Sequence, residues 1–207
     1  MLRVTSGTLR GFKLDVPNVE AVRPPLEMAR QAVFNILGQD MEGLRVLDIF
    51  AGSGIMGIEA MSRGAASALF VEKDRAAVAC MMRNLEKTKT LDCARVITAD
   101  AYQPKRFLKT GDEFDLVFLD PPFAVFADAE SRARLNTLVD ALLSSPSLAP
   151  GATVILRMPR AAHLEPLASL AAVDDDRSYG HSRILFLRRA APPGEASTDA
   201  TQGDGGR

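Results

Sequence analysis

The chain has 207 residues, of which 47% are hydrophobic and 25% charged, and its net charge at pH 7 is -1. These values are ordinary for one globular domain with a sizeable core, and they exclude a generally basic, histone-like binder but not a local basic patch. Its two cysteines, Cys80 and Cys93, lack metal-ligand spacing, which is typical of reduced thiols. We find no signal peptide and no apolar run of roughly 20 residues, so we expect a cytoplasmic protein that does not contact a membrane. From the cysteine spacing we also expect no metal site.

Residues 1–40 are predicted to form an extension ahead of the main fold. Residues 1–16 alternate in polarity around a Ser6-Gly7 turn, which predicts a small β-hairpin. Residues 26–37 place apolar side chains on one helical face, which predicts a helix.

Strands and helices are predicted to alternate over residues 41–189. Strands are predicted at residues 45–49, 67–72, 94–98, 114–119 and 152–157, and helices at 54–63, 74–87, 101–108, 131–144 and 163–170. Segments 171–178 and 183–189 are predicted to form an antiparallel hairpin at the sheet edge. The pattern indicates an α/β, Rossmann-like fold whose mostly parallel seven-stranded sheet has helices on both faces. Residues 190–207 contain no aliphatic side chain larger than alanine and are predicted to form a disordered tail.

A glycine loop follows the first of these strands. Because Gly52 and Gly54 lack Cβ atoms, a ligand can approach the backbone closely, and the helix that begins near Gly54 offers unpaired N–H groups. Residues 52–57 match GxGxxG, a dinucleotide-binding fingerprint. A nicotinamide-dependent oxidoreductase is therefore a rival interpretation of this loop.

Acidic residues near the strand ends favour S-adenosylmethionine instead. Asp48 lies at the end of the strand that leads into the loop, where a carboxylate can meet the cationic amino-acid group of S-adenosylmethionine but would repel a pyrophosphate. Glu72, at the end of the next strand, can accept hydrogen bonds from ribose hydroxyls in either cofactor. Asp100 is placed to bind an adenine amino group, or to cap a helix that follows it.

The sequence Asp120-Pro121-Pro122-Phe123 follows the predicted strand 114–119. The Asp120 carboxylate and the Pro121 carbonyl can accept the two N–H bonds of a nucleobase amine and bend its nitrogen toward sp³ geometry. The prolines fix φ and remove N–H donors, and the carboxylate stabilises positive charge that grows on the nitrogen during methylation. Phe123 offers a flat face on which an extruded base can stack.

With these motifs in view, the chain resembles the bacterial methyltransferases that modify guanine N2 in 16S ribosomal RNA of the small subunit. The resemblance covers residues 1–189 and is carried by Arg3 to Gly7, Arg10 to Leu14, Val22-Arg23-Pro24, Arg30, Phe34, Asn35, Leu37, Leu47 to Gly54, Asp120 to Phe123, and Tyr179-Gly180.

The resemblance implies a class I methyltransferase fold, S-adenosylmethionine as methyl donor and 2-methylguanine as product. It implies 16S rRNA, the small subunit or an assembly intermediate as partner, with a monomer as the default state. By position, the resemblance implies a cofactor set of Asp48, Phe50, Gly52, Gly54, Glu72, Asp100 and Ala101, and a catalytic set of Asp120, Pro121, Pro122 and Phe123.

Basic residues near the start of the chain are candidates for RNA contact. The first 14 residues contain no acid, so we expect a phosphate-facing patch made by Arg3, Arg10, Lys13, Arg23 and Arg30.

Two positions depart from the family's pattern, and two further functions stay open. The family usually has Thr where this chain has Pro25, and it often ends the fifth strand with an acid where this chain has Arg157. An adenine-N6 methyltransferase of DNA or RNA would share the chemistry of the Asp-Pro-Pro-Phe turn, although the chain has no room for the separate recognition domain usual in DNA enzymes. A non-catalytic RNA-binding module would require a vestigial cofactor site.

Overall fold

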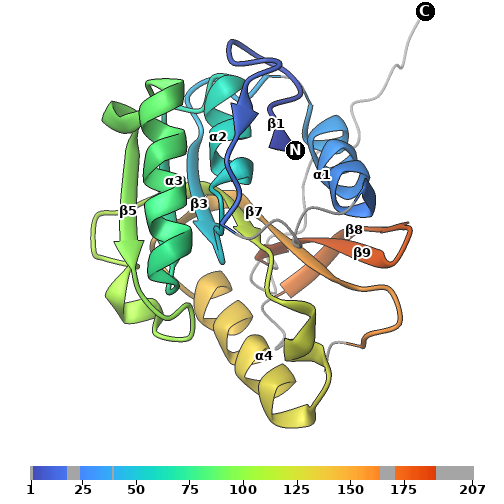
Figure 1. Cartoon of the computed structure of the whole chain (residues 1–207). Helices are drawn as coiled ribbons and strands as arrows, with labels where there is room; N and C mark the ends of the chain where they lie inside the picture. Colours follow the sequence, from blue (N-terminus) through green and yellow to red (C-terminus); the bar gives the residue numbers. More distant parts are fainter. Residues whose placement is uncertain (1, 18–23, 39, 164–170, 190–207) are drawn as a thin grey trace, which may run out of the picture.

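The computed structural model describes residues 2–17, 24–38, 40–163 and 171–189. Its main feature is a seven-stranded sheet with the strand order β5-β4-β3-β6-β7-β9-β8 (Figure 1). The strands are β3 (Arg45–Ile49), β4 (Ser67–Glu72), β5 (Ala94–Thr98), β6 (Phe114–Leu119), β7 (Leu148–Pro159), β8 (Ala171–Tyr179) and β9 (Ser182–Arg189). Strands β3 to β7 pair in parallel, whereas β9 is antiparallel to both β7 and β8. The predicted sheet and its closing hairpin are confirmed.

Helices cover both faces of the sheet, as predicted. They are α1 (Pro24–Leu37), α2 (Ile55–Ser62), α3 (Arg75–Thr88) and α4 (Ala129–Leu143), with short 3₁₀ turns η2 (Leu91–Cys93), η3 (Pro104–Arg106) and η4 (Phe123–Phe126). Side chains of α1, α2 and α3 share one buried cluster with Val46 and Phe70 of the sheet. Side chains of α4 share the other cluster with Leu47 and Leu69. Neighbouring strand residues therefore point to opposite cores, as the period-two geometry of a strand requires. None of the helices in the described residues is long and apolar enough to cross a membrane.

The predicted helix at residues 101–108 is wrong, because only the short turn η3 forms there. Asp100 accepts a hydrogen bond from the Tyr102 N–H at 3.1 Å, a local side-chain bond that competes with helix formation. Pro104 then begins the 3₁₀ turn. The predicted helix at 163–170 and the predicted tail at 190–207 lie outside the described residues, apart from residue 163.

The amino-terminal hairpin packs against the end of α2. Its strands β1 (Leu2–Arg3) and β2 (Lys13–Leu14) pair antiparallel, as predicted, and the Thr8 N–H donates to the Ser62 carbonyl at 2.8 Å. Gly7 has a φ of +76°, and a Cβ atom there would lie 1.8 Å from that same carbonyl oxygen. The close approach of the hairpin to α2 therefore requires glycine at this position.

Candidate active site

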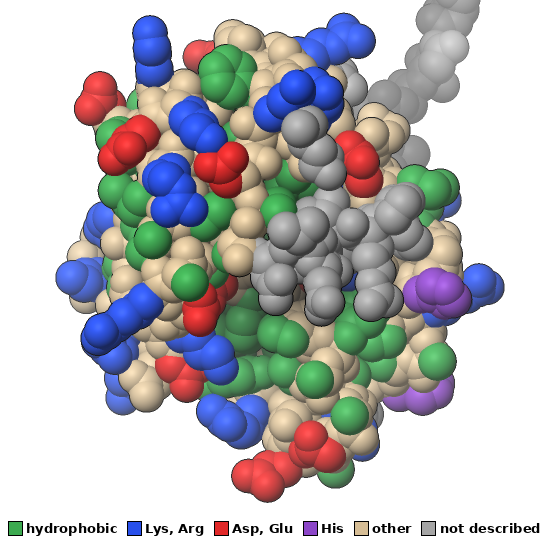
Figure 2. All heavy atoms as spheres, viewed as in Figure 1, with side chains coloured by type: hydrophobic (Ala, Val, Ile, Leu, Met, Phe, Trp, Pro, Cys, Tyr) green, Lys and Arg blue, Asp and Glu red, His purple; other side chains and the backbone are tan. Residues whose placement is uncertain are grey.

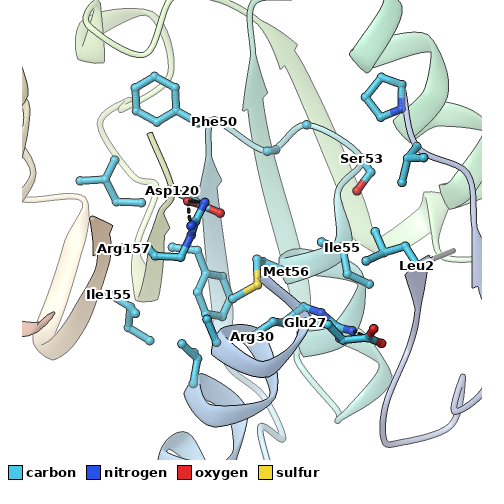
Figure 3. A pocket seen from close by; sticks show the side chains of 18 residues that line it. Leu2, Glu27, Arg30, Phe50, Ser53, Ile55, Met56, Asp120, Ile155 and Arg157 are labelled. Atoms are coloured by element: carbon cyan, nitrogen blue, oxygen red, sulfur yellow. Dashed lines mark hydrogen bonds and ion pairs between the residues drawn. The ribbon is translucent and has the colours of Figure 1, made fainter. Parts of the chain in front are cut away.

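A cavity of about 270 Å³ opens where the glycine loop faces the carboxyl ends of β6 and β7 (Figure 3). The loop contributes residues 50–53 to its wall, β6 leads into Asp120, and β7 contributes Arg157. Helix α1 and the amino-terminal residues close the opposite side. The fold thus brings the glycine loop and the Asp-Pro-Pro-Phe turn, two motifs far apart in the sequence, to one cavity. This is the edge where ligands bind in open parallel sheets.

The glycine loop has a left-handed backbone at three positions. Gly52 and Gly54 have φ values of +54° and +79°, and Phe50 has a φ of +63°. This region is uncommon for a bulky residue, and such strain is concentrated at functional sites. A Cβ on Gly52 would meet no atom within 4 Å, so its open side is accessible to a ligand. A Cβ on Gly54 would lie 2.8 Å from the Met81 side chain, so Gly54 serves helix packing rather than close approach of a ligand.

The N–H groups of this loop are largely used within the protein. Three of them donate to internal acceptors: Gly52 to the Glu72 carboxylate at 3.0 Å, Gly54 to the Ala51 carbonyl at 2.7 Å, and Gly57 to the Asp48 carboxylate at 3.0 Å. A dinucleotide site needs such groups to face the pyrophosphate. With two of the three occupied by carboxylates, the loop does not fit the oxidoreductase interpretation.

Three carboxylates meet at adjacent strand ends. Asp48 is 1% exposed, and burial raises its pKa well above the ordinary value. The hydrogen bond from Gly57 lowers that pKa, whereas the negative charges of Asp120 and Glu72 raise it further. Burial also raises the pKa of Asp120, against the opposing effect of Arg157. Such a cluster is unfavourable while its charges are uncompensated, and a cation would relieve it.

Asp100 lies within a group of aromatic and basic side chains that the sequence analysis did not identify. Tyr102 packs edge-on against Phe50, with ring centroids 5.8 Å apart, and Arg134 lies over the Tyr102 ring at 4.4 Å. Arg134 also lies 4.0 Å from the Asp100 carboxylate. The Tyr102 hydroxyl is buried without a hydrogen-bond partner among the described residues. The group provides flat surfaces beside a carboxylate, and the neighbouring residue Ala101 is buried.

The Asp-Pro-Pro-Phe turn contains an interaction that the motif alone does not reveal. Arg157 Nε and Nη2 both lie 2.6 Å from Asp120 Oδ1 (Figure 3), and the guanidinium lies 4.6 Å from the centre of the Phe123 ring. The Pro122 carbonyl accepts from the Val125 N–H at 2.9 Å as η4 begins. The predicted stacking face of Phe123 and the predicted acceptor on Asp120 are therefore both in contact with Arg157.

The predicted basic patch is only partly surface-exposed. Arg3, Arg10 and Lys13 are exposed, and Figure 2 shows Lys and Arg side chains spread over one face with acidic side chains among them. Arg23 lies outside the described residues. Arg30 does not belong to an exposed patch, contrary to the prediction, because it is only 5% exposed and is ion-paired with Glu59.

Glu59 is the centre of a buried polar network that the sequence analysis missed. This fully buried carboxylate on α2 accepts hydrogen bonds from the Thr5 and Ser6 N–H groups and ion-pairs with Arg63 at 2.9 Å and Arg30 at 2.6 Å. A buried Glu needs such partners to remain charged. The available signal for this network was an acid, Glu59, within the apolar run of α2. The acid-free start of the chain indicated a surface patch instead.

Comparison with known proteins agrees with this geometry. The family model described as Conserved hypothetical protein 95 matches residues 2–188. Ribosomal RNA small subunit methyltransferase D of Escherichia coli strain K12 is 40% identical over 123 residues, which are 59% of this chain and 60% of the relative. The match thus spans less than two thirds of the length of that relative.

Solved structures share the fold. The structure of yhhF from Escherichia coli has a TM-score of 0.76 and 29% identity, and the match covers 92% of this chain and 99% of that one. TrmN from Thermus thermophilus has a TM-score of 0.67 at 24% identity, covering 82% and 51% of the respective chains, and this likeness concerns the fold alone. The architecture is that of class I methyltransferases.

Proposed function

The chain belongs to the family described as Conserved hypothetical protein 95, and from that membership and the site we propose that it methylates the exocyclic N2 amine of a guanine in 16S ribosomal RNA. The methyl donor would be S-adenosylmethionine. The name of the Escherichia coli relative supports small-subunit ribosomal RNA as the substrate class. An adenine-N6 amine is the alternative target, because the same turn chemistry would serve it.

The observation that carries the proposal is the carboxylate cluster below the glycine loop. Asp48, Glu72 and Asp120 bring three carboxyl groups together, and a ligand that carries a sulfonium and an ammonium group would favour their ionised forms. Gly52 leaves the backbone open to the ligand, and the Asp100 carboxylate beside Tyr102 suits an adenosine moiety. S-Adenosylmethionine, when bound, supplies an electrophilic methyl group.

Asp120 and Pro121 would hold the amine that accepts the methyl group. The Asp120 carboxylate accepts one N–H of the amine and stabilises the positive charge that grows on the nitrogen. The Pro121 carbonyl is the second acceptor, and no backbone N–H of the described residues donates to it. Two acceptors fix the nitrogen lone pair in one direction, so orientation contributes to the rate alongside charge.

The test is transfer of labelled methyl groups to small-subunit RNA, or to small ribosomal particles, from cells that lack the modification. Nucleoside mass analysis would then identify the product. We expect N2-methylguanosine with the natural chain, no product with Asp120→Ala, and full activity with Asp92→Asn, which changes an exposed acid near the amino end of β5. Labelled N6-methyladenine would overturn the guanine assignment, and label only in DNA would overturn the RNA assignment.

A further inference from the structure

Arg157 occupies the space between the two side chains expected to hold the target base. Its Nε and Nη2 atoms, on one edge of the guanidinium, both approach Asp120 Oδ1 at 2.6 Å. The Cζ atom of the same group lies over the Phe123 ring, 4.6 Å from its centre. The Arg157 side chain is 18% exposed and the Asp120 side chain 34%, so the ion pair is accessible from the cavity that both residues line. One planar group thus donates to a carboxylate along its edge and lies over an aromatic ring.

A guanine base would make the same two contacts. Its N1–C2–N2 edge is itself a guanidine unit, with N–H donors on N1 and N2 that match Nε and Nη2 of arginine. Its ring can stack on an aromatic side chain. The Watson–Crick edge of adenine places one amine beside the N1 acceptor, so it cannot present two donors to one carboxylate.

We propose that Arg157 is a placeholder for the target guanine, which displaces the guanidinium from Asp120 and Phe123 when the base enters. This inference rests on the proposed function. Arg157 Nη1 also lies 3.3 Å from Ser182 Oγ on β9, so the displaced side chain keeps a polar partner on the far side of the site. Arg157 is a positioning residue in this scheme, because it acts through Asp120 and not on the reacting atoms.

The placeholder lowers the affinity for RNA. Base and arginine compete for one carboxylate, so the apparent affinity is reduced by the fraction of molecules in which the site is open. A base with two donors on one edge replaces both contacts of the guanidinium with Asp120, whereas adenine replaces one. Loss of Arg157 therefore strengthens RNA binding, while the preference for a base with two donors remains with Asp120.

The test compares steady-state kinetics of the natural chain with Arg157→Ala, Arg157→Lys and the matched control Arg160→Ala. Arg160 is exposed and lies three residues further along, so its removal takes away the same charge without touching Asp120. We expect KM for RNA to fall about three- to tenfold in Arg157→Ala, as competition from a partly exposed ion pair predicts. Arg157→Lys keeps the charge but loses the planar edge, and its KM should also fall. An unchanged or higher KM in both variants would overturn the proposal.

A second readout separates displacement from a purely structural role. Guanidinium ion, added at low millimolar concentration, should inhibit Arg157→Ala competitively with RNA by refilling the vacated position. Guanidinium should inhibit the natural chain no more than sodium chloride does at the same ionic strength. Equal sensitivity of the two proteins to guanidinium would argue against the placeholder. Product analysis keeps the two proposals apart, since N2-methylguanosine without a KM change refutes only the role of Arg157, whereas N6-methyladenine refutes the proposed function itself.

Discussion

Glu59 on α2 and Arg30 on α1 form an ion pair at 2.6 Å in which the carboxylate is fully buried and the arginine is 5% exposed. Arg63 reaches the same carboxylate at 2.9 Å, and the Thr5 N–H donates to it at 2.9 Å. Three parts of the chain, the amino-terminal hairpin, α1 and α2, therefore meet at one acidic group. The wall of the cavity formed by α1 and the hairpin depends on this junction.

Glu59→Gln is expected to destabilise the protein strongly. It removes the buried carboxylate charge that pairs with Arg30 and Arg63, and breaking a buried pair in this way costs about 3 to 5 kcal/mol. Urea denaturation followed by circular dichroism would measure the free energy of unfolding. Glu86→Gln, at an exposed position of α3, is the control and should change it little. Equal stability of the two variants would show that the junction contributes no net stability.

Gly57→Ala is expected to destabilise the protein despite the better helix propensity of alanine. A Cβ at Gly57 would lie 2.3 Å from the Phe70 ring, and overpacking of a core costs about 1 to 3 kcal/mol. The propensity gain is about 1 kcal/mol, so the clash dominates. Phe70→Leu in the same chain should recover part of the loss, which thermal melting of the single and double variants would reveal. Additive effects of the two changes would contradict direct contact between these positions.

Cofactor affinity is expected to rise with pH. Burial raises the pKa of Asp48 above the ordinary range, and a cationic ligand prefers the ionised carboxylate. Binding should therefore strengthen as pH rises through the raised pKa and become constant above it. The stability of the ligand-free protein should change in the opposite direction. The folded state holds a proton on Asp48 that the unfolded chain has already released, so the free energy of unfolding falls as pH rises over the same window.

Titration calorimetry with S-adenosylmethionine across this pH range would check that expectation. Asp48→Asn removes the titrating group and should flatten both the binding and the stability profiles. Asp92→Asn, an exposed acid distant from the loop, should leave both profiles as they are. A steep profile that persists in Asp48→Asn would assign the dependence to another group.

Asp120→Asn is expected to reduce kcat about 10²- to 10³-fold, as loss of one group that stabilises transition-state charge does. The amide keeps an acceptor for the amine hydrogen but lacks the negative charge. Cofactor binding should persist, since Glu72 and Asp48 remain, and calorimetry can verify this in the same preparation. A kcat near that of the natural chain would remove Asp120 from the chemistry.

Much of the sheet could be predicted because its signals are local. Strand β6 matches residues 114–119 since a short apolar run after a turn needs no distant partner to be recognised. The N-cap of α3 is local too, because the Asp74 side chain accepts a hydrogen bond from the Ala77 N–H, three residues away, at 2.7 Å. Both motifs of the site also follow strand ends, and parallel strands bring such ends to one edge.

Long-range pairing explains what the sequence analysis missed. Nothing near Arg30 in the sequence indicates that it pairs with Glu59, 29 positions away, so its charge suggested an exposed surface. Arg157 was noted only as a departure from the family's pattern, because its contact with Asp120 spans 37 positions. The incorrect helix at residues 101–108 arose differently, from local hydrogen bonding at Asp100 that outweighed an apolar pattern.

Asn84 on α3 connects segments that are far apart in the sequence and are therefore synthesised at different times. Its side chain donates to the Asp15 and Ser53 carbonyls at 2.9 Å and accepts from the Asp15 N–H at 2.8 Å. The residues near the hairpin are synthesised before their partners at positions 59 and 84. They can form these bonds only after α2 and α3 have emerged from the ribosome, and a pause in translation before residue 84 would prolong their exposure to chaperones and proteases.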